Sequence, residues 1–209
     1  MIRLEQHLGL GTTCLGVPSP AVFLDKDGTL VEDVPYNVDP ACLTLTVGAA
    51  AGLRLLHAAG YQLIVISNQS GVARGLFLEP ALLAVEAALR RLLLEHGVPL
   101  HGFYYCPHYP NGVVAEYAVA CSCRKPAPGL LLRAARERGT DLGRSWFVGD
   151  ILDDVEAGHR AGCRAILLDV GNETEWRPGP LRQPDCMASD LLDAARVIVG
   201  AGAGALLPA

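Results

Sequence analysis

The sequence predicts one α/β domain in which a parallel sheet carries helices on both of its faces. Three observations support this fold class: short apolar runs alternate with amphipathic segments, hydrophobic residues make up 51% of the composition, and 209 residues suffice for one sizeable domain. Strands that alternate with helices imply crossover connections, which place helices on both faces of a parallel sheet. We therefore expect a single domain over residues 1–209, with an N-terminal lead at 1–19 and a tail at 201–209.

The individual elements follow from local patterns. Strands are predicted at short apolar runs bounded by charged or turn residues, namely 21–25, 62–68, 102–106, 145–150 and 164–170. Helices are predicted at the segments between them and after the last, namely 48–60, 80–97, 129–139, 154–162 and 189–200. The clearest helix is 80–97, because Leu82, Val85 and Leu89 form an apolar stripe and Gly97 ends it.

Charge and hydropathy exclude several classes of function. The formal net charge of -5 and the pI near 5.6 argue against binding to nucleic acid. No apolar run approaches the ~20 residues that a membrane span needs. The first residues also lack the apolar block of a secretory signal. We expect a cytoplasmic monomer whose partner is a small molecule, neither a nucleic acid nor a membrane.

Polar side chains stand where predicted strands end. In a parallel α/β sheet, ligands bind in the crevice beyond the carboxyl ends of the strands. Four segments bring candidate site residues to this edge: Asp25 and Asp27, then Ser67 and Asn68, then Arg124 and Lys125, and finally Asp150. We expect these side chains to line one pocket.

The two aspartates after the first strand suit phosphoryl transfer. Asp25 can attack an electrophile while Asp27 handles the proton. Two carboxylates so close invite a divalent cation, and all-oxygen ligation is what Mg²⁺ prefers, so Asp150 could complete a metal site. Ser67 could hold anionic oxygens, and Lys125 could neutralise the charge that builds during transfer. The set favours hydrolysis of a phosphoester through an aspartyl-phosphate.

Four motifs resemble those of the haloacid dehalogenase (HAD) superfamily: "DKDGT" at 25–29, "VISN" at 65–68, a downstream lysine and "VGDILDD" at 148–154. The resemblance spans roughly residues 21–170. It implies a Rossmann-like HAD fold without a large cap domain, and a Mg²⁺-dependent phosphatase. The roles it implies are a nucleophile at Asp25, a general acid and base at Asp27, phosphate binders at Ser67 and Lys125, and a Mg²⁺ ligand at Asp150 beside Asp25 and the backbone carbonyl of Asp27. Asp154 is expected to support Lys125, although it could also cap the next helix.

Residues 106–123 contain a cluster of metal-ligand types, Cys106, His108, Cys121 and Cys123. An odd count of seven cysteines in a reducing compartment argues against a disulfide framework, and a bridge between Cys121 and Cys123 would close a strained ring. Metal binding is the better interpretation. Three thiolates and one imidazole leave no open position, which is typical of a structural Zn²⁺ site, and the resemblance strengthens this interpretation. Such a site would pin the loop that carries Arg124 and Lys125. The isolated cysteines are interpreted as small buried residues: Cys14, Cys42, Cys163 and Cys186.

The stretch "NQSGVARG" at 68–75 and the cysteine-histidine loop narrow the resemblance to the bacterial D-glycero-D-manno-heptose 1,7-bisphosphate phosphatases. This implies removal of the 7-phosphate of a heptose bisphosphate, with Asn68, Arg74 and Arg124 contacting the substrate. Two alternatives stay open: a phosphatase for histidinol phosphate or another small metabolite, and a zinc-loop module that binds nucleic acid or protein. The segment at 171–180 and the N-terminal lead have no role in this interpretation.

Overall fold

The computed structural model describes residues 18–204, so most of the predicted lead, Cys14 and residues 205–209 lie outside the described part. This part forms one parallel sheet with the strand order β3-β2-β1-β4-β5-β6. The strands are β1 (Ala21–Leu24), β2 (Gln62–Asn68), β3 (Gly102–Cys106), β4 (Trp146–Gly149), β5 (Arg164–Leu168) and β6 (Cys186–Ala188). The α-helices are α1 (Ala49–Ala58), α2 (Ala81–Glu95), α3 (Gly129–Arg138), α4 (Leu152–Ala161) and α5 (Leu191–Gly204), and two short 3-10 helices are η1 (Pro40–Cys42) and η2 (Leu142–Arg144).

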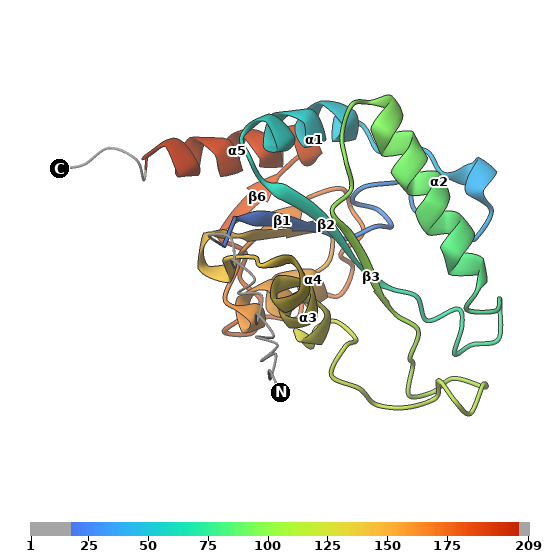
Figure 1. Cartoon of the computed structure of the whole chain (residues 1–209). Coiled ribbons are helices and arrows are strands. Elements are labelled where there is room, and N and C mark those ends of the chain that lie inside the picture. Colours follow the sequence, from blue (N-terminus) through green and yellow to red (C-terminus); the bar gives the residue numbers. More distant parts are fainter. Residues whose placement is uncertain (1–17, 205–209) are drawn as a thin grey trace, which may run out of the picture.

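The helices form two layers around the sheet, with α1, α2 and α5 on one face and α3 and α4 on the other (Figure 1). Successive side chains of a strand point to opposite faces, and β1 shows this directly. Val22 and Leu24 pack in the cluster that includes α1 and α5, whereas Phe23 packs in the cluster that includes α3 and α4. Because both faces are covered, the central strands are apolar at consecutive positions rather than alternating.

The strand order reverses its direction beside β1. From β1 the chain adds β2 and β3 on one side, and it then crosses back to add β4, β5 and β6 on the other. The carboxyl ends of β1 and β4 therefore meet at a topological switch point, where the connections leave in opposite directions and open a crevice. This crevice is where the predicted site residues of β1 and β4 lie.

The predicted fold class is confirmed, and every predicted strand and helix is present with small shifts at its ends. The strand β6 and the two 3-10 helices were not predicted, because segments as short as Cys186–Ala188 carry no periodic signal. Helix α5 runs to Gly204, so the first residues of the predicted tail are helical. The interpretation of Cys42 as buried is wrong: it is the last residue of η1 and is exposed, whereas Cys163 is buried as expected and Cys186 is half-buried. Among the described helices, none has the length and hydropathy to cross a membrane.

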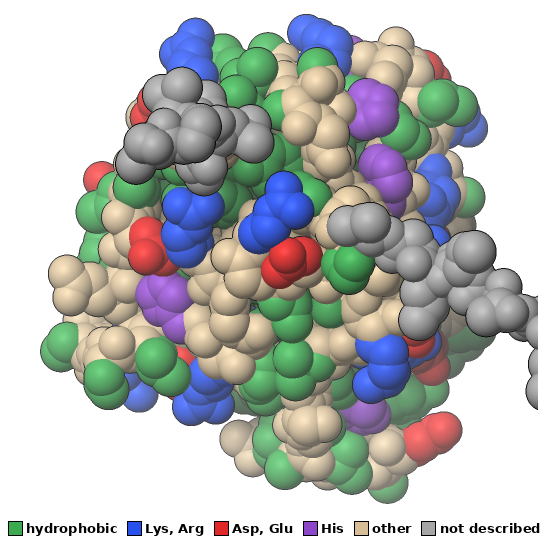
Figure 2. Space-filling view, turned by 60° about the vertical axis from the view of Figure 1, so that its left-hand side comes forward, with side chains coloured by type: hydrophobic (Ala, Val, Ile, Leu, Met, Phe, Trp, Pro, Cys, Tyr) green, Lys and Arg blue, Asp and Glu red, His purple; other side chains and the backbone are tan. Residues whose placement is uncertain are grey.

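Charged side chains are dispersed on the face that Figure 2 presents. Lys and Arg side chains of the described residues stand there singly between acidic, apolar and other groups. A continuous basic stripe is the usual footprint of a nucleic-acid binder. On this face, the described residues do not form one.

Candidate active site

Asp25 and Asp27 are positioned by a tight turn at the carboxyl end of β1. The amide of Asp25 still donates to the carbonyl of Val148 in β4, so Asp25 continues the sheet at the carboxyl end of β1. The turn continues through Gly28, whose φ of 79° suits glycine. A Cβ on Gly28 would lie 2.2 Å from Oδ2 of Asp150, so the turn packs directly against the aspartate that follows β4. The first motif therefore brings the acids of two strands together.

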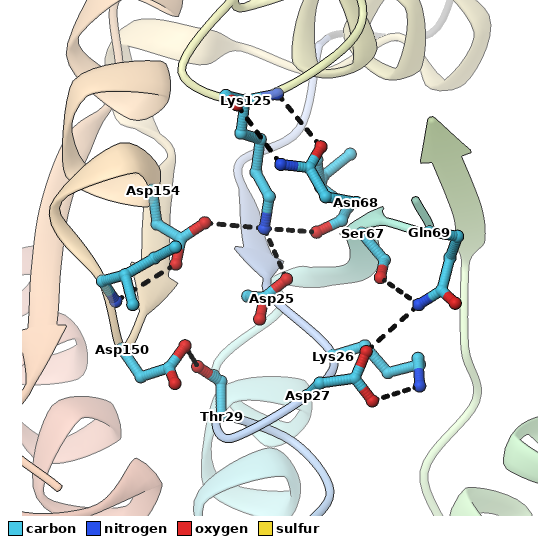
Figure 3. A network of polar contacts seen from close by, with 12 residues as sticks. Asp25, Lys26, Asp27, Thr29, Ser67, Asn68, Gln69, Lys125, Asp150 and Asp154 are labelled. Atoms are coloured by element: carbon cyan, nitrogen blue, oxygen red, sulfur yellow. Dashed lines mark hydrogen bonds and ion pairs between the residues drawn. The ribbon is translucent and has the colours of Figure 1, made fainter. Parts of the chain in front are cut away.

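Lys125 enters the site from the opposite side and is almost completely buried (Figure 3). Its Nζ forms ion pairs with Asp25 and, at 2.6 Å, with Asp154, and it also donates to the carbonyl of Ile66 at 3.2 Å. Burial acts to lower the pKa of Lys125, but the charges of Asp154 and Asp25 outweigh it and hold the pKa above its usual value. The lysine is therefore charged at neutral pH, as the predicted contact with a phosphate requires.

Asn68 fixes the backbone that carries Lys125. Its Oδ1 accepts from the amide of Lys125 at 3.1 Å, and its Nδ2 donates to the carbonyl of the same residue at 3.2 Å. These two bonds join the end of β2 to the loop after the cysteine cluster (Figure 3). Asn68 was predicted to contact the substrate, which stays a prediction; what the structure shows is that it holds the backbone of the lysine.

Asp27 lies on the other side of the pocket. It forms an ion pair with Lys26, and its Oδ2 accepts from Nε2 of Gln69 at 3.1 Å. Burial raises the pKa of Asp27 and the charge of Asp25 adds to this effect, while the ammonium of Lys26 opposes it. Gln69 also donates to Oγ of Ser67 at 2.8 Å, which leaves the Ser67 hydroxyl proton available to a ligand. A raised pKa suits a carboxyl group that must deliver a proton.

The pocket suits a divalent cation. One carboxylate oxygen from each of Asp25, Asp150 and Asp154 lies within 4.8 Å of the others, and all three residues are buried. Burial raises the pKa of Asp150 to about 6, and the nearby charge of Asp25 contributes. Buried acids that repel one another are stabilised by a cation, and a set of carboxylate oxygens is what Mg²⁺ prefers. Of the three, Asp154 is already paired with Lys125 and also accepts from the amide of Ile151 at 3.4 Å, so both roles expected for it are seen.

Cys106, His108, Cys121 and Cys123 converge on one point, as expected for metal ligands. Their sulfur atoms lie 3.1 to 3.5 Å apart, and Nδ1 of His108 lies 3.3 Å from the sulfur of Cys123 and 3.7 Å from that of Cys106. Zn–S bonds of ~2.3 Å give tetrahedron edges of roughly 3.7 Å, so the cluster is close to, and slightly tighter than, a zinc site. The donor set therefore fits Zn²⁺.

The loop at 106–123, called the metal loop below, has a second attachment that does not involve the cysteine-histidine cluster. Glu79, which precedes α2, accepts from the hydroxyl of Tyr105 at 3.0 Å and from the hydroxyl of Tyr117 at 2.7 Å. Tyr117 lies inside the loop, so this carboxylate ties the middle of the loop to β3. Removing the metal would therefore loosen the ends of the loop more than its middle.

Arg74 and Arg124 are brought together by Tyr109, a residue of the metal loop. The guanidinium of Arg74 lies 4.1 Å from the centre of the Tyr109 ring, and that of Arg124 lies 5.2 Å from it. Arg74 also approaches the ring of Tyr36, at 5.9 Å. Within residues 18–204 neither arginine forms an ion pair, and Nε of Arg74 is buried without a hydrogen-bond partner. Two cations held side by side in this way can receive an anionic group.

Tyr36, which Arg74 approaches, lines a pocket that adjoins the acidic one. A cavity of about 290 Å³ is lined by Tyr36, Asn68 and Asp27 among others, and a cavity of about 270 Å³ is lined by Asp25, Lys125 and Asp150. Asp27 and Asn68 line both cavities, so the two adjoin. Five predicted site residues thus line one opening at the switch point, namely Asp25, Asp27, Asn68, Lys125 and Asp150.

Sequence reasoning missed several contacts of this site, made by Thr29, Gln69, Tyr109 and Asn172. Thr29 and Gln69 belong to the quoted motifs, so their closeness in sequence to Asp25 and Ser67 could have identified them. Tyr109 carried no such signal, because its role depends on two arginines that are distant in sequence. Asn172 lies in the segment that had no role, and its contact with Asp150 forms only in the folded chain.

Comparisons with known proteins place the chain in a class. The family model described as HAD-hydrolase-like matches residues 122–194. The D-glycero-β-D-manno-heptose-1,7-bisphosphate 7-phosphatase of Yersinia pestis is 38% identical over 160 residues, covering 77% of this chain and 81% of that protein. The enzyme of the same name from Escherichia coli K12 is 37% identical over 166 residues, covering 79% and 83%. A crystal structure of the D,D-heptose 1,7-bisphosphate phosphatase of B. bronchiseptica with magnesium and phosphate aligns with a TM-score of 0.75 and 30% identity, covering 87% of this chain and 99% of that one.

The fold, the four motif segments and the family model together define a phosphoric monoester hydrolase of the HAD type. Within that class, the chain belongs to the family of the heptose-1,7-bisphosphate 7-phosphatases.

Proposed function

We propose that this protein is a Mg²⁺-dependent phosphatase that removes the 7-phosphate of D-glycero-D-manno-heptose 1,7-bisphosphate. The observation that carries the proposal is the pairing of two adjoining cavities. One is lined by Asp25 and Lys125, which form an ion pair. The other is lined by Tyr36, whose ring Arg74 approaches, and Arg74 stacks on the ring of Tyr109 together with Arg124. A substrate with two phosphates can place one in each. The names of the 37–38% identical relatives support the same substrate.

The reaction proposed for the acidic pocket has two steps. In the first, a carboxylate oxygen of Asp25 forms a bond to phosphorus as the bond to the sugar oxygen breaks, and Asp27 gives its proton to that oxygen. In the second, a water molecule loses a proton to Asp27 and attacks phosphorus, which breaks the bond to Asp25 and releases phosphate. Lys125 and Ser67 contact the phosphoryl oxygens in both steps, so the charge that develops meets fixed donors.

We propose that Mg²⁺ is held by Asp25, Asp150 and the backbone carbonyl of Asp27. Bound there, Mg²⁺ supplies positive charge that offsets the repulsion between acids and phosphate. The B. bronchiseptica relative was crystallised with magnesium and phosphate, which supports this assignment.

A direct test compares substrates. Purified protein should be assayed for phosphate release from both anomers of heptose 1,7-bisphosphate, from the corresponding 1-phosphate and 7-phosphate, and from histidinol phosphate. We expect the highest kcat/KM for a bisphosphate, with the 1-phosphate as product. Equal or better turnover of histidinol phosphate would contradict the substrate assignment. Phosphate release that does not depend on Mg²⁺ would contradict the proposed metal requirement.

Histidinol phosphate is disfavoured by the two arginines that stack on Tyr109 near the second cavity. It carries an amine where the bisphosphate carries a phosphate, and a cation placed beside Arg74 and Arg124 would be repelled. No contact of the described residues favours the nucleic-acid or protein module. A monomeric state and a cytoplasmic location stay predictions.

We propose that Zn²⁺ occupies the cysteine-histidine cluster and positions Arg124 and Lys125. The Cys123→Ser variant should lose the bound zinc, and kcat/KM should fall about tenfold or more because the adjacent phosphate contacts loosen. Metal content per chain and kcat/KM measured on the same sample check this. The Cys42→Ser variant is the matched control, since Cys42 is exposed and lies outside the cluster. A zinc-free Cys123→Ser protein with unchanged kcat/KM would show that the metal does not position these residues.

The Mg²⁺ requirement should depend on pH through Asp150. The pKa of Asp150 is raised to about 6 by burial and by Asp25, and a protonated carboxyl does not bind the ion. The apparent affinity for Mg²⁺ should therefore fall about tenfold for each pH unit below that pKa and level off above it. The Mg²⁺ concentration that gives half-maximal activity, measured from pH about 5 to about 8, checks this. A requirement that stays constant across that range would contradict the assignment of Asp150.

A further inference from the structure

The segment after β5 reaches back into the acidic pocket through Asn172. Its Nδ2 lies 2.6 Å from Oδ2 of Asp150. An ionised carboxylate can only accept hydrogen bonds, so the amide nitrogen, rather than the amide oxygen, must face it. Asn172 lines the same cavity of about 270 Å³ as Asp25 and Lys125. It is thus a wall of the pocket, although it lies 22 residues after Asp150 in the sequence.

Asp150 is held on both of its oxygens. Oδ1 accepts from the hydroxyl of Thr29 at 3.2 Å, while Oδ2 accepts from Asn172. A Cβ on Gly28 would lie 2.2 Å from Oδ2 of Asp150 and 2.4 Å from Nδ2 of Asn172, so the pair packs directly on the turn of the first motif. The carboxylate therefore has little freedom to rotate.

Asn172 is itself anchored by its neighbour Glu173. One oxygen of Glu173 accepts from the amide of Leu152 at 2.7 Å, at the start of α4. The other accepts from the amides of Glu175 at 2.8 Å and Trp176 at 3.2 Å, which folds the segment onto itself. Helix α4 begins two residues after Asp150, so the anchor and the aspartate belong to the same local structure.

The rest of the segment is fastened to the same helix. Nη1 of Arg182 donates to Asp153 at 2.9 Å and to Glu156 at 2.7 Å. His159 contacts the carbonyl of Leu181 and Oδ2 of Asp185, both at 2.9 Å. With contacts at its beginning and its end, the segment 171–185 holds Asn172 against the pocket.

We propose that Asn172 is a positioning residue for the magnesium site, and that its amide orients Asp150 for metal binding. The inference rests on the proposed function, because it takes Asp150 as a ligand. Mg²⁺ demands near-ideal octahedral geometry, so a ligand that can rotate binds it less well than one that is fixed. Hydrogen bonds to a ligating carboxylate supply that fixation, and removing such a partner typically weakens metal affinity about 10- to 100-fold.

The test measures Mg²⁺ binding apart from catalysis. Mg²⁺ alone is titrated calorimetrically into wild type and the Asn172→Ala variant, and the Mg²⁺ concentration for half-maximal hydrolysis is measured in parallel. We expect the variant to bind Mg²⁺ at least about tenfold more weakly than wild type. Its kcat at saturating Mg²⁺ should stay within about twofold of the wild-type value. The matched control is Glu175→Gln in the same segment, because among residues 18–204 the Glu175 side chain pairs only with Arg177, at the surface. It should bind Mg²⁺ as wild type does.

Two outcomes would overturn the inference. If Asn172→Ala lowers Tm but leaves Mg²⁺ affinity unchanged, the contact is merely structural. If Glu175→Gln weakens Mg²⁺ binding as much as Asn172→Ala, the effect comes from the segment as a whole and not from the amide. An Asp150→Asn variant separates these failures from failure of the proposed function. If Asp150→Asn binds Mg²⁺ as wild type does, the metal site itself is misassigned, whereas loss of binding there confirms the site independently of Asn172.

Discussion

Replacing Asp25 by asparagine should lower kcat for phosphate release by about 10³-fold or more, because the amide cannot form the bond to phosphorus that the proposed reaction requires. Asn has nearly the same shape as Asp, so the pocket should keep its outline. The measurement is phosphate release from heptose 1,7-bisphosphate and from a generic phosphoester at saturating Mg²⁺. Both activities should be lost together, because the nucleophile serves any substrate.

The loss should not result from unfolding. The charge of Asp25 raises the pKa of Asp27 and of Asp150, which shows that it repels the other acids of the pocket. Removing that charge relieves repulsion, and Lys125 retains its pairing with Asp154. We expect the metal-free variant to have a Tm equal to or above that of wild type. An Asp25→Asn protein that is folded and still active would refute the nucleophile.

Asp169 offers a matched control for this experiment. It follows β5 at the same edge of the sheet, is exposed and lines neither cavity of the site. Asp169→Asn removes one negative charge from that edge without touching the pocket. Its activity should equal that of wild type. A comparable loss in both variants would point to the charge of the whole edge rather than to a nucleophile.

Replacing Lys125 by methionine should remove both activity and much of the stability. Methionine has a similar length but no charge, so Asp25 and the fully buried Asp154 lose their common cation. Breaking a buried ion pair by removing one partner typically costs about 3–5 kcal/mol, because the remaining charge stays buried. The free energy of unfolding, measured by denaturant titration in the absence of Mg²⁺, should fall by about that amount.

A second substitution distinguishes the two losses. Asp154→Asn in the Lys125→Met background removes the uncompensated carboxylate, so much of the lost stability should return. Activity should not return, because the double variant still lacks the cation that faces the phosphoryl group. If the double variant is no more stable than Lys125→Met, then the Lys125–Asp154 pair does not account for the destabilisation. If it regains activity, Lys125 has no role in catalysis.

How much of this site could be read from the sequence depended on the kind of contact. Asp25, Ser67 and Asp150 stand directly after buried strands, and the geometry of a parallel sheet brings such residues together whatever the loops do. Lys125 and the metal ligands lie on a long loop, and their spacing alone was only moderately specific. Resemblance to known motifs supplied what local pattern could not.

The contacts that were missed are those made between distant loops. Asn172 meets Asp150 because Glu173 and the residues after it fasten the segment to α4, and none of these bonds leaves a periodic pattern. Tyr109 stacks with two arginines from different segments for the same reason. Cys42 was predicted to be buried because cysteine is among the residues most often buried in proteins. It lies instead in a 3-10 turn and is exposed. Side chains on loops follow tertiary contacts, which a single sequence does not display.

Arg124 and Lys125 are consecutive residues, and the proposed roles assign one phosphate to each. The positions of their two cationic groups then set the separation between the two anions, and Asn68 holds the backbone of Lys125 in place. The loop would therefore select sugar bisphosphates by the distance between their two phosphates. A ketose or aldose bisphosphate one carbon shorter could place one phosphate correctly but not the other.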